Sequence, residues 1–169
     1  ANPDFANPIN YLKKIENAIP PNYNMIIKAH PKDTEIFNYY KFNKNTFMYN
    51  GKLAPLLKDA EIIISTGSTS GYEALTLKKK IIYLGSKTYL GGLSKNISPI
   101  KIIDNLLNLE SEIKNTLREP IANDKINNYL LSLIKNSIEA NIGTSPKRGK
   151  KFVRNNYLAF YNSISKDFK

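Results

Sequence analysis

The sequence IISTGSTSGYEAL, residues 63–75, decides the fold. It begins in an apolar run, continues through hydroxyl-bearing residues and glycines, and ends in a segment with helical character from Gly71. A short β-branched run, a Ser/Thr/Gly turn and then a helix are typical of a strand that ends at the ligand-binding edge of an open α/β sheet. We therefore expect this turn to bind a phosphate group.

Short apolar runs and helical patterns alternate through the first half of the chain. Runs that are almost entirely β-branched are typical of parallel strands covered on both faces. The expected strands are residues 25–28, 46–49, 62–65 and 81–85, and the expected helices are residues 8–18, 53–58 and 71–79. This alternation predicts right-handed crossovers and a Rossmann-like α/β fold with an open parallel sheet.

The second half of the chain has a different pattern. From Ser98 onward we expect only helices and connecting loops, with helices over residues 100–117, 124–140 and 152–164. The apolar face of the middle helix consists of Ile126, Leu130, Leu133, Ile134 and Ile138. The interpretation is a single domain, with an α/β core at residues 1–97 and a helical extension packed on it at residues 98–169.

The order of the expected elements raises a question about the start of the sheet. Doubly wound nucleotide-binding halves usually begin with a strand at the centre of the sheet. The first element expected here is the helix over residues 8–18. Either residues 1–7 contribute something irregular, or the sequence is a fragment cut just after that strand.

Composition excludes several classes of site. The chain has 169 residues, no cysteine and one histidine, so disulfides, thiolate metal sites and histidine-cluster zinc sites are excluded. No carboxylate cluster follows an expected strand, and we therefore expect neither a metal nor another cofactor. No apolar run is long enough to span a membrane and no signal-peptide pattern is present, which favours a cytoplasmic location.

The net charge of +11 indicates a partner with negative charge. Nucleic acid, anionic lipid headgroups and phosphorylated small molecules all fit, but abundant Lys, Asn and Ile indicate compositional bias and argue against nucleic acid. The basic loop at residues 143–151 is either a solvated loop or a peripheral contact with an anionic membrane or the acceptor.

The turn after the expected third strand has the chemistry of a phosphate site. The first N–H groups of a helix have no partner within the helix and attract an anion, and hydroxyls add donors. The donors are expected from Ser65, Thr66, Gly67, Ser68, Thr69 and Ser70. The lysine of a Walker loop is absent. A plain turn with a Ser70–Glu73 capping box is the alternative, so Glu73 is either a cap or a ligand contact to a ribose hydroxyl.

The second candidate site is IIKAHP, residues 26–31, in which the only histidine follows an apolar strand. His30 is either a structural residue or a group that neutralises, or protonates, a departing phosphate, with Lys28 nearby. Without a metal, such a site suits one phosphate better than a diphosphate. This favours a donor activated by CMP over one activated by UDP.

Together, the His30–Pro31 strand end, the Ser/Thr turn before Gly71 and the run KIIYLG at residues 80–85 resemble a known protein family. They are similar to the C-terminal, nucleotide-sugar-binding half of bacterial capsule and lipooligosaccharide glycosyltransferases of GT-B type. The closest likeness is to CMP-Kdo and CMP-sialic acid transferases, including sialyltransferases, with their HP and S-S/T motifs. The resemblance covers residues 8–95.

The resemblance implies a function and roles for individual residues. His30 would assist the departure of CMP, Lys28 and the Ser/Thr turn would hold its phosphate, and Glu73 would contact the ribose or base. The partners would be a CMP-sugar donor carrying sialic acid or Kdo and a glycan or glycolipid acceptor. Alternatives are a CDP-glycerol glycerophosphotransferase or UDP-sugar enzyme on the same scaffold, and a non-catalytic basic module that binds polyanions.

Overall fold

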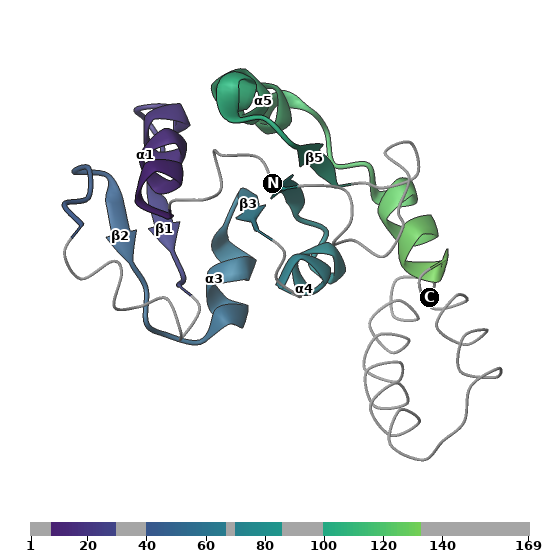
Figure 1. The fold of residues 1–169 in the computed structure, drawn as a ribbon. Helices are drawn as coiled ribbons and strands as arrows, with labels where there is room; N and C mark the ends of the chain where they lie inside the picture. Colours follow the sequence, from purple (N-terminus) through teal and green to yellow (C-terminus); the bar gives the residue numbers. More distant parts are fainter. Residues whose placement is uncertain (1–7, 30–39, 67–69, 86–99, 133–169) are drawn as a thin grey trace, which may run out of the picture.

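Helices and parallel strands alternate in the structure, a computed structural model that describes residues 8–29, 40–66, 70–85 and 100–132 (Figure 1). Residues 123–132 are helical and follow the last of the labelled elements. The labelled elements are α1 (Pro8–Ala18), β1 (Met25–Ile27), β2 (Thr46–Met48), α3 (Leu53–Asp59), β3 (Ile62–Ser65), α4 (Ser70–Thr76), β4 (Lys80–Leu84), β5 (Lys101–Ile103), η3 (Leu106–Asn108) and α5 (Leu109–Arg118). The fold is α/β and Rossmann-like, as predicted.

All the strand pairs are parallel, and they form two sheets over the described residues. β1 pairs with β2, and β3, β4 and β5 form a three-stranded sheet in that order. Ile26 lies opposite Phe47 in the first sheet, and Ser65 lies opposite Tyr83 in the second. The predicted strands are therefore present and parallel, but no hydrogen-bonded ladder joins β1 to β3.

The predicted helix over residues 100–117 is wrong in its first part. Lys101–Ile103 form strand β5, which pairs with β4 in the register Tyr83 to Ile102. The helical segment begins only later, with η3 and then α5. Because β5 extends the sheet, residues after position 100 contribute to the α/β core.

Two hydrophobic clusters cover the two faces of the three-stranded sheet. Side chains of β4 alternate between them: Ile81 and Tyr83 belong to one cluster, and Ile82 and Leu84 to the other. The first cluster also contains residues of α3, α4 and the helix at 123–132, and the second contains residues of α1, η3 and α5. Helices therefore cover both faces, as expected of a doubly wound sheet.

The last turn of α1 is anchored at the amino ends of β1 and β2. The carboxylate of Glu16 is buried and accepts a hydrogen bond from Asn43 N at 3.0 Å. It also accepts one from the side chain of Thr46, the first residue of β2. Next to this anchor, the side chain of Asn45 donates to Pro21 O at 3.1 Å. These bonds fix the end of α1 relative to the first sheet.

Part of the predicted helical extension lies outside the described residues. Ile126 and Leu130 are buried in the first cluster, as the predicted apolar face requires, and Tyr129 joins them. Leu133, Ile134 and Ile138 lie outside the described residues, as do the basic loop at 143–151 and the predicted helix at 152–164.

Candidate functional site

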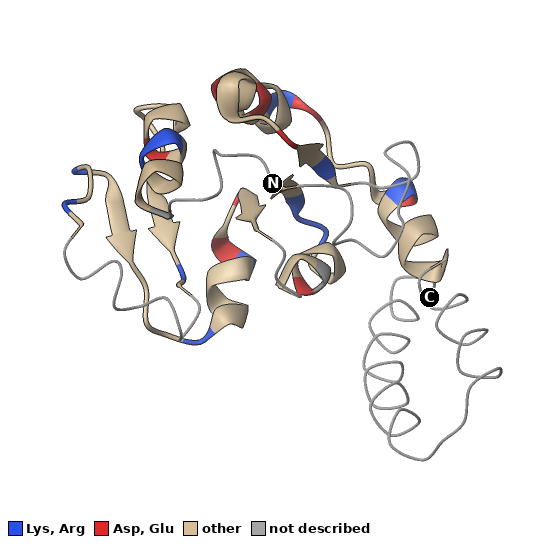
Figure 2. Cartoon of the chain, viewed as in Figure 1, with Lys and Arg blue, Asp and Glu red and all other residues tan. Residues whose placement is uncertain are grey.

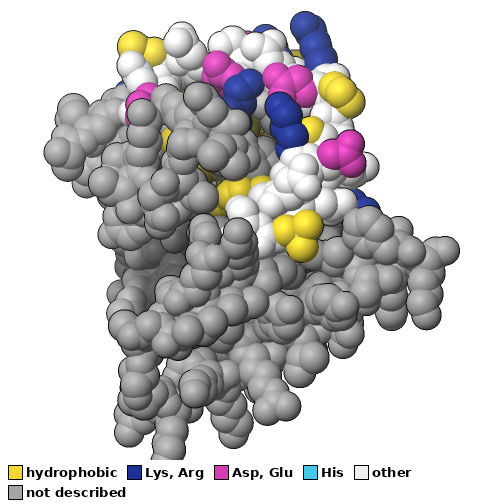
Figure 3. All heavy atoms as spheres, turned by 90° about the vertical axis from the view of Figure 1, so that its right-hand side faces the viewer, with side chains coloured by type: hydrophobic (Ala, Val, Ile, Leu, Met, Phe, Trp, Pro, Cys, Tyr) yellow, Lys and Arg dark blue, Asp and Glu magenta, His cyan; other side chains and the backbone are white. Residues whose placement is uncertain are grey.

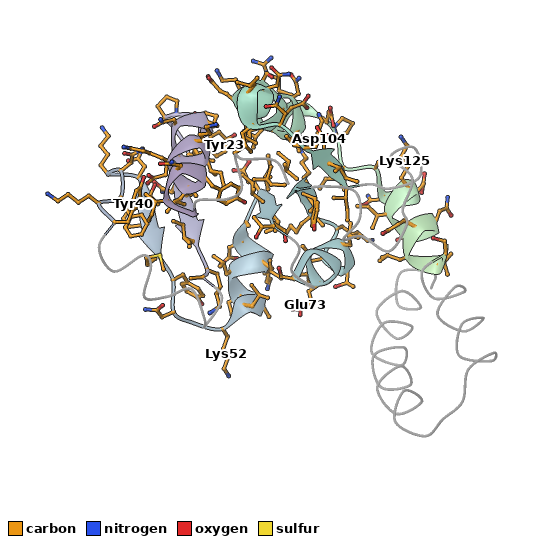
Figure 4. All side chains as sticks on the ribbon, viewed as in Figure 1. Tyr23, Tyr40, Lys52, Glu73, Asp104 and Lys125 are labelled. Atoms are coloured by element: carbon orange, nitrogen blue, oxygen red, sulfur yellow. The ribbon has the colours of Figure 1, made fainter. Side chains whose placement is uncertain are left out.

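The candidate site lies at the carboxyl edge of the three-stranded sheet. Because the strands are parallel, the ends of β3, β4 and β5 meet at one edge, which carries Ser65, Gly85 and Asp104. Gly85 N donates to Ile103 O at 3.0 Å and continues the ladder to this edge. Ligands of open α/β sheets bind beyond the carboxyl ends of the strands. Figure 4 shows Asp104 beyond the end of β5.

Ser65 is the residue of this edge with the clearest potential for binding. Only 6% of its surface is exposed, and its Oγ has no hydrogen-bond partner among the described residues. A buried hydroxyl without a partner costs about 1–3 kcal/mol, so native proteins usually satisfy such groups with a protein, water or ligand atom. Ser65 is thus a donor already desolvated at the predicted position.

Thr66 follows Ser65 and connects the edge to α1. Thr66 is exposed, and its side chain lies beside the Tyr11 hydroxyl. Burial raises the pKa of Tyr11 far above its usual value, the neighbouring Thr66 side chain acts in the opposite direction, and nearby Tyr83 raises it further. Tyr11 therefore remains a neutral hydroxyl at any physiological pH.

Tyr11 was not among the predicted site residues. It lies one position from Leu12, outside the apolar stripe of Ile9, Leu12 and Ile15, and nothing in the local sequence indicates its partner. Tyr11 and its neighbour Thr66 are 55 positions apart in the chain, so only the fold reveals their proximity. It places the first turn of α1 at the carboxyl edge of β3.

The residues of α4 are only partly described. Gly67, Ser68 and Thr69 lie outside the described residues, and Ser70 is the first residue of the helix, half-buried and engaged with other groups. Glu73 is exposed on the first turn, and its carbonyl accepts a bond from Thr76 Oγ1 at 2.7 Å (Figure 4). The roles predicted for these residues stay predictions.

The structure describes only the first part of the second candidate site, residues 26–31. Lys28 is exposed directly after β1, and His30 lies outside the described residues. Lys28, predicted to be the last residue of this strand, instead follows its end at Ile27, and its proximity to Ser65 stays a prediction. The role of His30 in the departure of CMP also stays a prediction.

Several lysines of this basic chain have structural partners. Lys80 Nζ donates to Leu117 O at 2.7 Å, and Lys79 Nζ donates to Lys58 O, each near the C-terminal end of a helix. Cations at that end interact favourably with the helix dipole. Lys101 forms a 2.6 Å ion pair with Glu112. Part of the positive charge therefore serves the fold.

The charged residues that the structure describes are interspersed. Figure 2 shows Lys and Arg on several elements with Asp and Glu among them. Figure 3 shows the same mixture on the described part of one face. Within the described ranges, no cluster of His, Asp or Glu could hold a metal ion. No helix there is both long and apolar enough to cross a membrane.

A hollow lies at the amino edge of the first sheet, the edge opposite to the carboxyl ends of its strands. It has a volume of about 290 Å³ and is lined by the end of α1, the turn after it and the residues before β2, including Glu16, Tyr23 and Lys44. These residues lie at the amino ends of β1 and β2. The hollow is therefore separate from the carboxyl edge that carries Ser65.

Comparison with known proteins identifies the family to which the chain belongs. The family described as capsule polysaccharide biosynthesis protein matches residues 8–105, which include both strand ends of the candidate site. The chain belongs to this family. Its role is therefore in surface-polysaccharide synthesis, and the matched region runs from α1 to just past β5. No curated protein and no solved structure matches the chain.

Proposed function

We propose that this member of the capsule biosynthesis family is the donor-binding part of a GT-B glycosyltransferase. It binds a sugar activated by CMP, either sialic acid or Kdo, which is transferred to a glycan or glycolipid acceptor. The observation that carries the proposal is Ser65, a buried hydroxyl at the carboxyl edge of a parallel sheet that has no partner among the described residues. The family match supports the surface polysaccharide as the product.

The proposed reaction replaces one C–O bond with another. The acceptor hydroxyl attacks the anomeric carbon of the sugar and loses its proton to a base, while the bond to the phosphate oxygen of CMP breaks. Negative charge develops on the departing phosphate. Donors fixed in advance around that charge lower the barrier, because they need not reorganise during the reaction.

Each part of the carboxyl edge has a role in this proposal. Ser65 and the hydroxyls and amides of the turn after it, Thr66 to Ser70, donate to the phosphate of CMP. His30 and Lys28 neutralise the charge from the β1 side, and the imidazolium can pass a proton to the phosphate oxygen. Glu73, exposed on α4, contacts the ribose or base. No residue of this chain is assigned as the base.

Calorimetric titration with CMP, CDP, UDP and ATP tests the proposal, first without metal and then with magnesium. We expect CMP to bind most tightly and without metal, and Ser65→Ala and His30→Ala each to weaken binding about 10-fold or more, the effect of losing one hydrogen bond to a charged group. Ser111→Ala, exposed on α5, is the control. Preference for CDP or UDP would indicate the glycerophosphotransferase or UDP-sugar alternative.

A peripheral location at the inner face of the membrane is part of the same proposal. The basic loop at residues 143–151 would contact anionic lipid, where each Lys or Arg contributes about 1 kcal/mol. Co-sedimentation with phosphatidylserine vesicles, compared with neutral vesicles, tests it. A non-catalytic polyanion-binding module predicts instead that binding to nucleic acid falls steeply with salt and survives the loss of Ser65.

A further inference from the structure

Two adjacent hydroxyl side chains at the end of β3 lie on opposite faces of the sheet. Successive side chains of a strand point to opposite faces. Ile63 packs against the first hydrophobic cluster, and Ile62 and Ile64 pack against the second. Ser65 therefore continues the face of Ile63, on the side of α4, and Thr66 continues the face of Ile64, on the side of α1. The two hydroxyls are thus supported by different helices.

Tyr11 is the residue of α1 that reaches Thr66. It is half-buried, its side chain packs against the second cluster, and its hydroxyl oxygen is buried. The side chain of Thr66, which is itself exposed, lies beside this hydroxyl. Packing therefore fixes the ring, and the ring holds one polar atom against the exposed end of the strand. Residues that orient a binding side chain are typically locked by packing in this way.

The hydroxyls of Tyr11 and Thr66 differ in what they can offer to a ligand. Burial raises the pKa of Tyr11 far above its usual value, so its hydroxyl keeps its proton and can donate it in a hydrogen bond. A threonine hydroxyl has one proton and two lone pairs. When Tyr11 donates to Oγ1 of Thr66, the proton of Thr66 is left to point away from Tyr11. Thr66 then becomes a donor with a fixed direction at the carboxyl edge.

We propose that Tyr11 is a positioning residue of the donor site: its hydroxyl donates to Oγ1 of Thr66 and so directs the Thr66 hydroxyl toward the phosphate of the bound nucleotide. Tyr11 acts through Thr66 and does not touch the ligand. A donor whose direction is set in advance need not reorganise as charge develops on the phosphate. The inference rests on the proposed function, and it makes α1 a part of the donor site.

The hydroxyl and the ring of Tyr11 can be tested separately. Tyr11→Phe removes the hydroxyl and keeps the ring that packs against the second cluster. Tyr23→Phe makes the same chemical change in the turn after α1, at the amino edge, and is the matched control. Thr66→Val removes the hydroxyl of Thr66 and nearly keeps the shape of its side chain.

Titration calorimetry of the full chain with CMP measures these effects. We expect Tyr11→Phe and Thr66→Val each to weaken CMP binding about 3–10-fold, the effect of losing one hydrogen bond. Tyr23→Phe should leave the affinity unchanged. Because Tyr11 acts through Thr66, the double variant should bind CMP no more weakly than Thr66→Val alone, whereas a general effect of Tyr11 on the structure would add to that loss.

The possible failures of the two proposals can be told apart. No binding of CMP by the wild type would overturn the proposed function, and this inference with it. Binding that Ser65→Ala weakens and Tyr11→Phe leaves unchanged would overturn this inference alone. A loss on Tyr11→Phe that is equally large in the Thr66→Val background would also overturn it, because Tyr11 would then act without Thr66.

Discussion

The Tyr40 hydroxyl donates a hydrogen bond of 2.5 Å to Oε2 of Glu16, which joins the last turn of α1 to the segment before β2. Glu16 also accepts from Asn43 N and from Thr46, so its carboxylate satisfies three donors. Replacing the carboxylate with an amide removes acceptor capacity from a buried position. We expect Glu16→Gln to lower the free energy of unfolding by about 1–3 kcal/mol in urea denaturation. Glu61→Gln, exposed before β3, should change it by less than about 0.5 kcal/mol.

The stabilisation by Glu16 should depend on pH. Burial raises the pKa of its carboxyl group, but the bonds from Tyr40, Asn43 and Thr46 outweigh this effect and hold the pKa below its usual value. A carboxyl group whose pKa is lower in the folded state stabilises the fold above its unfolded pKa, about 4.3, and the contribution is lost as pH falls through the folded pKa. The difference in unfolding free energy between wild type and Glu16→Gln should therefore be constant above about pH 6 and shrink toward pH 3. A difference that grows on acidification would contradict the assignment.

The ionisation of Tyr40 at alkaline pH should reveal its contact with Glu16. Burial and the neighbouring Glu16 carboxylate raise its pKa to about 12. In an ultraviolet absorbance titration, the difference between wild type and Tyr40→Phe should contain one ionisation near that pH. In the Glu16→Gln background the same difference should shift to lower pH, because the negative neighbour is gone. An unchanged midpoint would show that Glu16 does not act on Tyr40.

Ser65→Ala should have different effects on the stability of the fold and on the binding of CMP. Its buried hydroxyl lacks a partner among the described residues, so its removal should leave the thermal midpoint unchanged or raise it. Affinity for CMP should nevertheless fall by about 10-fold or more. Thermal denaturation and titration calorimetry on the same preparation measure both. A lower midpoint with unchanged affinity would assign Ser65 a purely structural role.

Leu109 and Leu107 form a matched pair in the segment after β5. Leu109 is 1% exposed in the second cluster, and Leu107, two residues earlier, is 81% exposed. Leu109→Ala should cost about 2–5 kcal/mol of unfolding free energy because it leaves a cavity. Leu107→Ala should change it by less than about 0.5 kcal/mol. Equal effects in urea denaturation would contradict the packing of η3 and α5.

Gly85 and Gly71, at the carboxyl edge, should respond in opposite ways to alanine. Gly85 has φ +141°, which L-residues rarely adopt, so Gly85→Ala should destabilise the fold by about 1–3 kcal/mol. Gly71 lies in the first turn of α4, and none of the atoms that the structure describes lies within 4 Å of an added Cβ, so Gly71→Ala should stabilise the helix by about 0.5–1 kcal/mol. Thermal denaturation of both variants tests the pair. Destabilisation by Gly71→Ala would show that the space beside it is occupied.

Local sequence patterns predicted most elements of this fold. The isoleucine run of β3 and the stripe of Ile9, Leu12 and Ile15 in α1 each gave the observed bounds. Strand β5 was missed because Ile100, Ile103, Leu106 and Leu109 continue the spacing of α5 backwards. A three-residue strand cannot be told from a helical turn by such spacing. Its pairing with β4 is a long-range contact that local periodicity does not encode.

The position of the candidate site was predictable from the sequence, but the burial and the hydrogen-bond partners of its side chains were not. A Ser/Thr turn after an apolar strand places Ser65 at the ligand edge, but the burial of its hydroxyl depends on residues from other elements. The proximity of Tyr11 to Thr66 and the hydrogen bond from Tyr40 to Glu16 likewise join distant positions. Hydroxyl and carboxylate partners of this kind leave no periodic signal in the sequence.

Helix α1 keeps two sets of contacts well apart: Glu16 and its donors lie at the amino edge of the strands, and Tyr11 and Thr66 lie at the carboxyl edge. Substitutions at sites without shared partners usually have additive effects. Changes around Glu16, Tyr40 and the hollow can therefore accumulate, in evolution or in engineering, with little epistasis toward Ser65. A lineage of this family could adapt its thermal tolerance at one edge while its donor preference diverges at the other.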